Sequence, residues 1–347
     1  MTLGPLLIDV AGQQLTPEDR EILRHPLVGG VILFTRNYAD PAQLTALVAD
    51  VKQARSPALL VTVDHEGGRV QRFRTGFSLL PTARRIGHEF DADHAAGVAL
   101  ARQLNWLMAA ELRAVGIDLS FAPCVDLDYG VSTVIGDRAL HRDPDKVGRL
   151  AVASMLGMRA AGMGAVAKHF PGHGAVVADS HHVLPIDRRT LADLEQDLRP
   201  YYTLIANELP AVMVAHVLFP EVDALPASLS RRWIQGVLRE QMHFGGAVFA
   251  DDLSMAGATQ FGGPVERAQQ ALAAGCDVLP ICNRREDVVA VLDGLRIEVD
   301  SALALRLVRL RGRGPKRALA LLQASSEWLQ CRELLARCER PPTLKLG

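Results

Sequence analysis

The chain has 347 residues, of which 49% are hydrophobic and 5% aromatic, and its formal net charge is -1. This size fits one large domain or two small ones. The near-neutral charge gives no electrostatic reason to expect a nucleic acid or an acidic membrane as partner. Five scattered cysteines without a CxxC pair indicate neither a disulfide framework nor a zinc ribbon. These totals favour a protein of the reducing cytoplasm.

The N-terminal segment MTLGPLLIDVAG lacks the basic start of a signal peptide, and Asp9 interrupts its short apolar run. We therefore interpret it as a first strand. No uncharged apolar stretch approaches the roughly 20 residues that a membrane-spanning helix needs. We expect a soluble, cytoplasmic monomer that acts on a small molecule and has no membrane or nucleic-acid partner.

Short apolar runs rich in β-branched residues recur along the chain, with helical patterns between them. Most of these runs are continuous rather than alternating, which is typical of parallel strands buried on both faces. The eight predicted strands span residues 6–10, 28–34, 58–64, 118–127, 165–170, 211–219, 246–251 and 277–282.

The segments between the strands have helical patterns, several of which begin with Asp, Ser or Thr and end at Gly. Examples are residues 40–55, 94–116, 145–164 and 266–275. Alternating strands and helices with a strand count near eight predict an α/β fold, a closed TIM-type (β/α)8 barrel. Because no repeat or linker divides the chain, we expect a single domain over residues 1–347. The barrel would take about residues 1–298, and basic helices would form a C-terminal extension over about 299–347.

Polar residues collect where the predicted strands end, which in a barrel is the face that carries the active site. So many charged groups are costly to bury unless they pair or bind a polar ligand, and a sugar with many hydroxyls fits this requirement. Glycoside cleavage needs a carboxylate on one face of the sugar ring and a proton donor on the other. Asp251 ends an apolar strand that would fix its position, so we predict that it is the nucleophile.

The loop KHFPGHGAVVADSHH, from Lys168 to His182, holds four histidines, a lysine and an aspartate. Histidine titrates near neutral pH, and a carboxylate two residues before it can orient its ring. Asp179 and His181 have this spacing and predict an acid/base pair. The same histidines leave open a zinc site in a metal-dependent hydrolase. The Pro-Gly pair inside HFPGH argues against the helix that such an HxxxH pair would use.

Five separate motifs occur in one order along the chain: VDHEGGRVQRF at 63–73, IGDR at 135–138, KHFPGHG at 168–174, the DSH that follows it, and FADDLSM at 249–255. Together they resemble the bacterial β-N-acetylhexosaminidases of glycoside hydrolase family 3, of the single-domain NagZ type. The resemblance covers about residues 5–295. It implies a TIM-type barrel, in agreement with the strand count, and no cofactor or metal.

The resemblance also implies a role for each matching residue. Asp251 would be the nucleophile, His181 the general acid/base and Asp179 its dyad partner. The residues implied to contact N-acetylglucosamine are Asp64, Arg72, Arg138, Lys168 and His169. The implied reaction is retaining exo-hydrolysis of terminal GlcNAc from muropeptides, GlcNAc-1,6-anhydro-MurNAc peptides, in peptidoglycan recycling. Transfer of the sugar to phosphate stays open, because a neutral histidine repels phosphate less than a carboxylate would.

Several neighbouring residues carry separate expectations. Relatives commonly read DQEGG where this chain has DHEGG, so His65 replaces an amide beside Asp64. Glu66 and Arg69 are expected to pair with each other and to contact no ligand. His216 fits either a lining position or a hydrogen-bonded core position, and Asp252 is expected to cap or orient its neighbour. His182 has no assigned role.

Overall fold

The computed structural model describes residues 3–180, 183–297, 301–314 and 317–338. Each of the eight predicted strand ranges contains a strand, and all eight strands pair in parallel. The strands are β1 (Leu6–Ile8), β2 (Val28–Leu33), β3 (Leu60–Val63), β6 (Leu119–Ser120), β7 (Val166–Phe170), β8 (Ala211–Val214), β9 (Ala247–Ala250) and β10 (Leu279–Ile281). A short antiparallel hairpin, β4 (His65–Gly67) with β5 (Val70–Gln71), was not predicted.

The parallel strands form two hydrogen-bonded sheets, one in the order β10-β1-β2-β3-β6 and the other in the order β7-β8-β9. Isolated parallel bridges connect the two sheets at both edges. At one edge Leu119 lies opposite Gly164 and Cys124 opposite Lys168, and at the other edge Phe249 lies opposite Val278. The strands are buried along their whole length, as their continuous apolar sequences predict.

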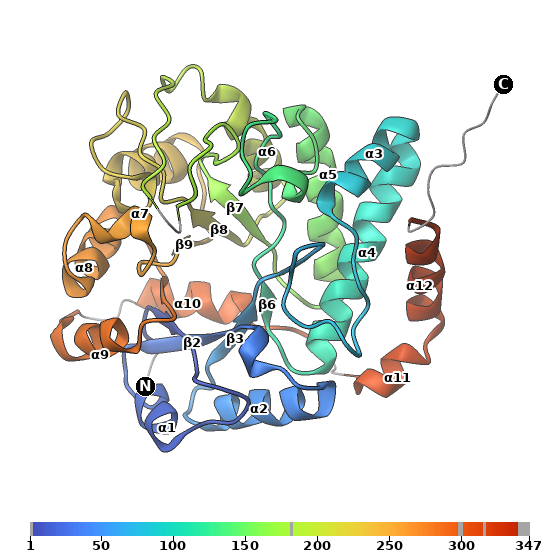
Figure 1. The fold of residues 1–347 in the computed structure, drawn as a ribbon, viewed down its shortest axis with the longest axis horizontal. Helices are drawn as coiled ribbons and strands as arrows, with labels where there is room; N and C mark the ends of the chain where they lie inside the picture. The colour runs from blue at the N-terminus through green and yellow to red at the C-terminus, as the bar shows by residue number, and fades with distance from the viewer. Residues whose placement is uncertain (1–2, 181–182, 298–300, 315–316, 339–347) are drawn as a thin grey trace.

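Helices surround the strands (Figure 1). They follow the expected alternation, and the predicted helical segments contain α2, α4, α5 and α8. The main helices are α1 (Pro17–Leu23), α2 (Pro41–Gln53), α3 (Ala83–Ala92), α4 (His94–Ala114), α5 (Pro144–Ala160), α6 (Glu195–Ile205), the π-helix η4 (Arg232–Gln241), α7 (Ala256–Thr259), α8 (Pro264–Ala274) and α9 (Arg285–Gly294). Local sequence sets their ends. The Asp40 carboxylate caps α2 by accepting from the backbone of Ala42 and Gln43, and α8 ends at Gly275 with φ 113°.

The C-terminal part is helical, as expected, but it breaks into several helices. They are α10 (Ser301–Leu310), α11 (Leu319–Gln323) and α12 (Ser326–Cys338). α12 packs on α4, where the Trp328 indole N–H donates to the buried Glu111 carboxylate at 2.7 Å. The result is a single-domain α/β fold with parallel sheets covered by helices. None of the helices in the described part of the chain has the length and apolarity that spanning a bilayer requires.

Candidate active site

The predicted site residues that fall within the described chain all line one cavity of about 390 Å³. They are Asp64, Arg72, Arg138, Lys168, His169, Asp179 and Asp251. His181 and His182 lie outside the described residues, so the Asp179–His181 pair stays a prediction. The cavity opens where strands end: Asp64 follows β3, Lys168 and His169 are the third and fourth of the five residues of β7, and Asp251 follows β9. Residues far apart in the sequence are thus brought together at one face, as strand ends of parallel sheets should be.

Lys168 and His169 are consecutive in β7, yet both line the cavity. In a regular strand, neighbouring side chains point to opposite faces. The register of β7 on β8 shifts here, because Ala167 pairs with Val212 and Phe170 pairs with Val214. Two residues of β7 therefore lie opposite one residue of β8. This bulge is what allows both side chains to reach the same space.

The cavity wall holds a network of ion pairs. The Lys168 ammonium lies 2.9 Å from an Asp64 carboxylate oxygen and 2.6 Å from a Glu66 oxygen. The Arg138 guanidinium donates two hydrogen bonds to Glu66, through Nε at 2.9 Å and Nη2 at 2.8 Å. Arg72 lies 3.5 Å from Asp64 on the more exposed side. Three cations and two carboxylates are thus held together in a largely buried wall, where paired charges are needed.

Burial alone would raise the pKa of the Asp64 and Glu66 carboxyls. The adjacent cations outweigh that effect, so the pKa of each carboxyl is lowered below its ordinary value. Burial would likewise lower the pKa of the Lys168 ammonium, but the two carboxylates raise it. All three groups therefore stay charged at neutral pH.

The expected pairing of Glu66 with Arg69 is wrong. Glu66 points inward from β4 to Lys168 and Arg138, whereas Arg69 sits at the turn of the β4–β5 hairpin and is half exposed. The Arg69 guanidinium donates to the backbone carbonyls of Thr133 and Val134. The hairpin, which was not predicted, is the physical reason: it turns the two side chains in different directions.

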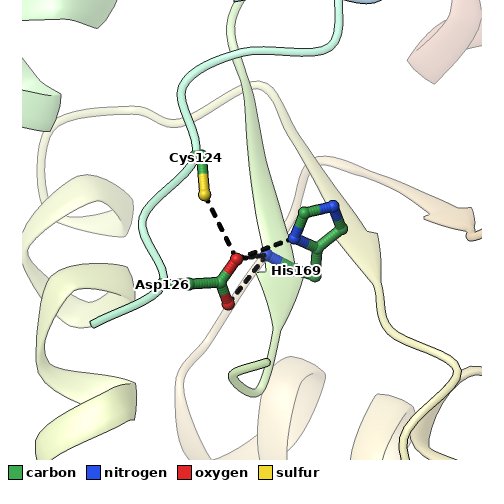
Figure 2. A group of neighbouring side chains, drawn as sticks. All are labelled: Cys124, Asp126 and His169. Atoms are coloured by element: carbon green, nitrogen blue, oxygen red, sulfur yellow. Dashed lines mark hydrogen bonds and ion pairs between the residues drawn. The ribbon is translucent and has the colours of Figure 1, made fainter. Parts of the chain in front are cut away.

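Asp126 is a site residue that sequence reasoning missed, and Figure 2 shows it with His169 and Cys124. Its carboxylate lies 2.7 Å from His169 Nδ1, and it accepts from the backbone N–H of His173 at 2.8 Å and from the Cys124 thiol at 3.2 Å. Burial opposes ionisation, but His169 and the backbone N–H of His173 lower the pKa of Asp126 to about 2. Because the ionised Asp126 carboxylate can only accept, His169 Nδ1 carries the proton of their hydrogen bond. This hydrogen bond orients the ring so that Nε2 lies 3.4 Å from the Arg138 guanidinium.

Comparisons with known proteins identify the family. The family model described as "Glycosyl hydrolase family 3 N terminal domain" matches residues 6–310. This chain belongs to glycoside hydrolase family 3. The beta-hexosaminidase of Thioalkalivibrio sulfidiphilus is 50% identical over 346 residues, which cover 100% of this chain and 99% of that protein. The beta-hexosaminidase of Nitrosospira multiformis is 50% identical over 97% of both chains.

Solved structures show the same relationship. NagZ from Neisseria gonorrhoeae, in complex with N-trifluoroacetyl-D-glucosamine, superposes with a TM-score of 0.93 at 42% identity, over 98% of this chain and 99% of that one. A family 3 β-N-acetylglucosaminidase from Paenibacillus has a TM-score of 0.83 at 33% identity, over 96% of this chain and 66% of that one. The expected resemblance to the β-N-acetylhexosaminidases of this family is confirmed.

Within the described part of this family 3 hydrolase, the cluster that could hold a metal is Cys124, Asp126 and His169, whose ligand atoms lie within 4.8 Å of one another. Zinc uses such donor types. Two ligands of a tetrahedral zinc ion are about 3.3 Å apart, whereas Nδ1 and the carboxylate oxygen lie 2.7 Å apart. Burial also raises the pKa of the Cys124 thiol well above its ordinary value. In this structure the Asp126 carboxylate joins the Cys124 thiol and the His169 ring by hydrogen bonds, and so supports His169.

The remaining polar residues near the site occupy supporting positions. The His65 ring is buried against Phe73 and Phe77 outside the cavity lining, and burial lowers its pKa to about 3. It is therefore neutral at neutral pH and does not line the cavity. His216 is a hydrogen-bonded core histidine, with Nδ1 2.6 Å from the Ser228 hydroxyl.

Asp252 orients the backbone beside Asp251, as expected. Its carboxyl oxygen accepts from the backbone N–H of Ser254 at 2.9 Å and of Cys282 at 3.1 Å. The backbone N–H of Asp252 donates to the Asp251 carboxylate at 2.9 Å, and the Asp251 N–H donates to Val214 O of β8 at 3.0 Å. Burial raises the pKa of Asp252 to about 7. Its carboxyl is therefore protonated in mild acid, which avoids a second negative charge beside Asp251.

Proposed function

We propose that this family 3 hydrolase is a retaining exo-β-N-acetylglucosaminidase in which Asp251 forms a covalent glycosyl-enzyme. One observation carries the proposal: Asp251 shares a cavity of ligand size with a wall of paired cations and carboxylates and with Asp179. Relatives at 50% identity over the full length carry the name beta-hexosaminidase. The cavity joins a nucleophile to groups that can clamp hydroxyls, and glycoside cleavage requires both.

In the first step, an Asp251 oxygen bonds to the anomeric carbon while the bond from that carbon to the leaving oxygen breaks. His181, held by Asp179, gives its proton to the leaving oxygen. In the second step, water displaces Asp251 and returns a proton to His181. Two inversions give net retention of the β configuration. Asp64, Arg72, Arg138, Lys168 and His169 would hold the GlcNAc ring through charged hydrogen bonds.

The substrates we propose are muropeptides that carry GlcNAc linked to 1,6-anhydro-MurNAc, which places the enzyme in cytoplasmic peptidoglycan recycling. We further propose a monomer without cofactor or metal, with one catalytic domain made of a barrel (about 1–298) and a helical extension (about 299–347). Closure of the two sheets into a (β/α)8 barrel is part of the proposal. The parallel bridges from Leu119 to Gly164 and from Phe249 to Val278 support it, since they join both pairs of sheet edges.

A trapped intermediate tests the nucleophile. A 5-fluoro β-GlcNAc glycoside with an activated leaving group should accumulate a covalent adduct, because fluorine destabilises the cationic transition state of both steps. We expect the adduct on the peptide that contains Asp251. An adduct elsewhere, or Asp251→Ala activity equal to that of the parent, would refute the assignment. Running the reaction with and without phosphate distinguishes hydrolysis from phosphorolysis, because phosphorolysis releases GlcNAc 1-phosphate.

The acid/base has a separate test. Replacing His181 by Ala should reduce cleavage of poor leaving groups far more than cleavage of an activated aryl β-GlcNAc glycoside, because only poor leaving groups need protonation. Asp179→Asn should follow the same trend more weakly. Equal losses with both substrates would argue against proton donation by His181.

A further inference from the structure

A second cavity, of about 530 Å³, lies at the opposite end of the strands from the candidate active site. One wall is formed by residues that lead into β7, β8 and β9, among them residues 162–165, 208–210 and 243–247. The other wall comes from α10, which packs beside β9, and from the segment that follows α10 (Figure 1). The two cavities have no lining residue in common.

This second cavity is strongly cationic. Its lining includes a single carboxylate, that of Glu208, together with the five arginines Arg159, Arg306, Arg309, Arg311 and Arg313. Glu208 is already paired with Arg159 at 3.2 Å, and both side chains lie on the exposed rim. Four guanidiniums therefore remain without a counter-charge from the lining itself.

The nearest buried carboxylate does not neutralise them. Asp277 accepts from Arg306 at 2.6 Å and from Arg239 at 2.8 Å, so two guanidiniums share one negative charge. The exposed Arg309 and Arg313 side chains make no hydrogen bond or ion pair within the described part of the chain. A guanidinium presents a planar set of donors that fits phosphate oxygens in pairs. Two such groups on one cavity wall are available to an anionic ligand.

The segment that carries these arginines is held in place. The Arg313 backbone N–H donates to Gly162 O at 2.8 Å, and the Gly312 N–H donates to the Asp118 carboxylate at 3.2 Å. A Cβ at position 312 would lie 1.7 Å from the guanidinium of the buried Arg113, so a larger residue there would displace that guanidinium from its ion pair with Asp118. A pre-positioned set of cations loses less entropy on binding than a flexible one.

Part of the same lining is apolar, including Met155, Met163 and Phe244. The volume lies within the range of small-molecule cavities, and its hollow shape suits a compact ligand better than a long polymer. We propose that this cavity binds a small phosphorylated metabolite with at least two phosphate groups. Its phosphates contact the arginines of α10 and the following segment, and an organic part, where present, packs on the apolar wall.

Isothermal titration of the full chain with pyrophosphate and with ADP, at low salt, tests the proposal. Pyrophosphate supplies the phosphates alone, and ADP adds an organic part. The double variant Arg309→Gln with Arg313→Gln should weaken binding at least tenfold, and raising the salt concentration should weaken it further. The matched control is Arg231→Gln with Arg232→Gln. This pair of exposed arginines lies outside the cavity and removes the same charge.

Binding of pyrophosphate and ADP alike would show that phosphates suffice, and preference for ADP would assign a role to the apolar wall. If the control variant loses as much affinity as the cavity variant, binding depends only on the overall surface charge, and the proposal is overturned. If neither pyrophosphate nor ADP binds, the proposal is also overturned. This holds even if a single-stranded oligonucleotide binds. Hydrolysis of an aryl β-GlcNAc glycoside should be unchanged in both double variants, which checks that they fold.

Discussion

Replacing Glu66 by Gln removes the carboxylate that contacts both Lys168 and Arg138 while it preserves the shape of the side chain. Lys168 keeps Asp64 as a partner at 2.9 Å. Arg138 loses its anionic partner and one of two acceptors, because the Gln side chain has one neutral carbonyl oxygen and one NH2 group, although the guanidinium is still close to His169. The substitution therefore tests whether Glu66 positions the two cations for the sugar or serves only the fold.

The magnitude follows from burial and chain length. Leaving one partner of a buried ion pair without its counter-charge costs about 3–5 kcal/mol in the free energy of unfolding. An unfolding entropy of about 2.1 cal/mol/K per residue, over 347 residues, gives a Tm change of about 1.4 °C per kcal/mol. We expect Tm to fall by about 4–7 °C. Loss of one charged hydrogen bond to the substrate costs about 1.5–3 kcal/mol, so kcat/KM should fall about ten- to a hundredfold.

The assay is thermal unfolding together with steady-state hydrolysis of an aryl β-GlcNAc glycoside. Asp287→Asn is the matched control, because Asp287 pairs with the buried Arg267 at 3.0 Å outside the cavity. The control should lower Tm and leave kcat/KM unchanged. Glu66→Gln with parental Tm and parental kcat/KM would refute the reasoning. A lower Tm with unchanged kcat/KM would refute the positioning role.

Three further substitutions have defined outcomes. Asp126→Asn should lower kcat/KM about tenfold, because His169 loses the anion that fixes its tautomer. Because the pKa of Asp126 is about 2, the stabilising effect of its carboxylate is complete above about pH 4 and is lost as pH falls toward 2. The acid unfolding curves of parent and variant should therefore converge near pH 2. For Asp252, with a pKa of about 7, the contribution of its carboxyl to stability is greatest below about pH 4 and is lost as pH rises from about 4 to 7. Asp252→Asn should therefore gain up to about 4 kcal/mol relative to the parent across that interval, and parallel pH curves would contradict this. His65→Gln should leave the kcat/KM profile between pH 5 and 8 unaltered, since the neutral ring does not titrate there.

The sequence predicts the fold well where strands are buried on both faces, because such strands appear as continuous apolar runs. All eight predicted strands contain real ones, but the range 118–127 contains only Leu119–Ser120 as strand. Pro123 lies in the rest of that range and has no N–H to donate to a ladder. The C-terminal pattern predicted helix correctly without locating the breaks between α10, α11 and α12, because propensity defines helix ends poorly.

The site residues were predictable in kind because strand ends and motifs mark them, and the described ones meet in one cavity. Partners were not predictable. Glu66 pairs with Arg138, 72 residues away in the sequence, and not with the nearby Arg69, because the hairpin turns the two neighbouring side chains in different directions. Asp126 lies one residue before the end of a predicted strand, much as Asp251 ends another, so the same rule could have found it. Its contact with His169 spans 43 positions and needs the packed sheet.

The bulge in β7 has a consequence for variation and engineering. Lys168 and His169 are consecutive in the sequence, yet both side chains line the cavity. In a regularly pleated strand, only one of two neighbouring side chains would face it. Deleting one residue within β7 would restore one-to-one pairing with β8, and inserting one would enlarge the bulge; either change would alter which side chains face the cavity. This stretch should therefore tolerate substitution at single positions better than any change in its length, and it would have to be transplanted as a unit.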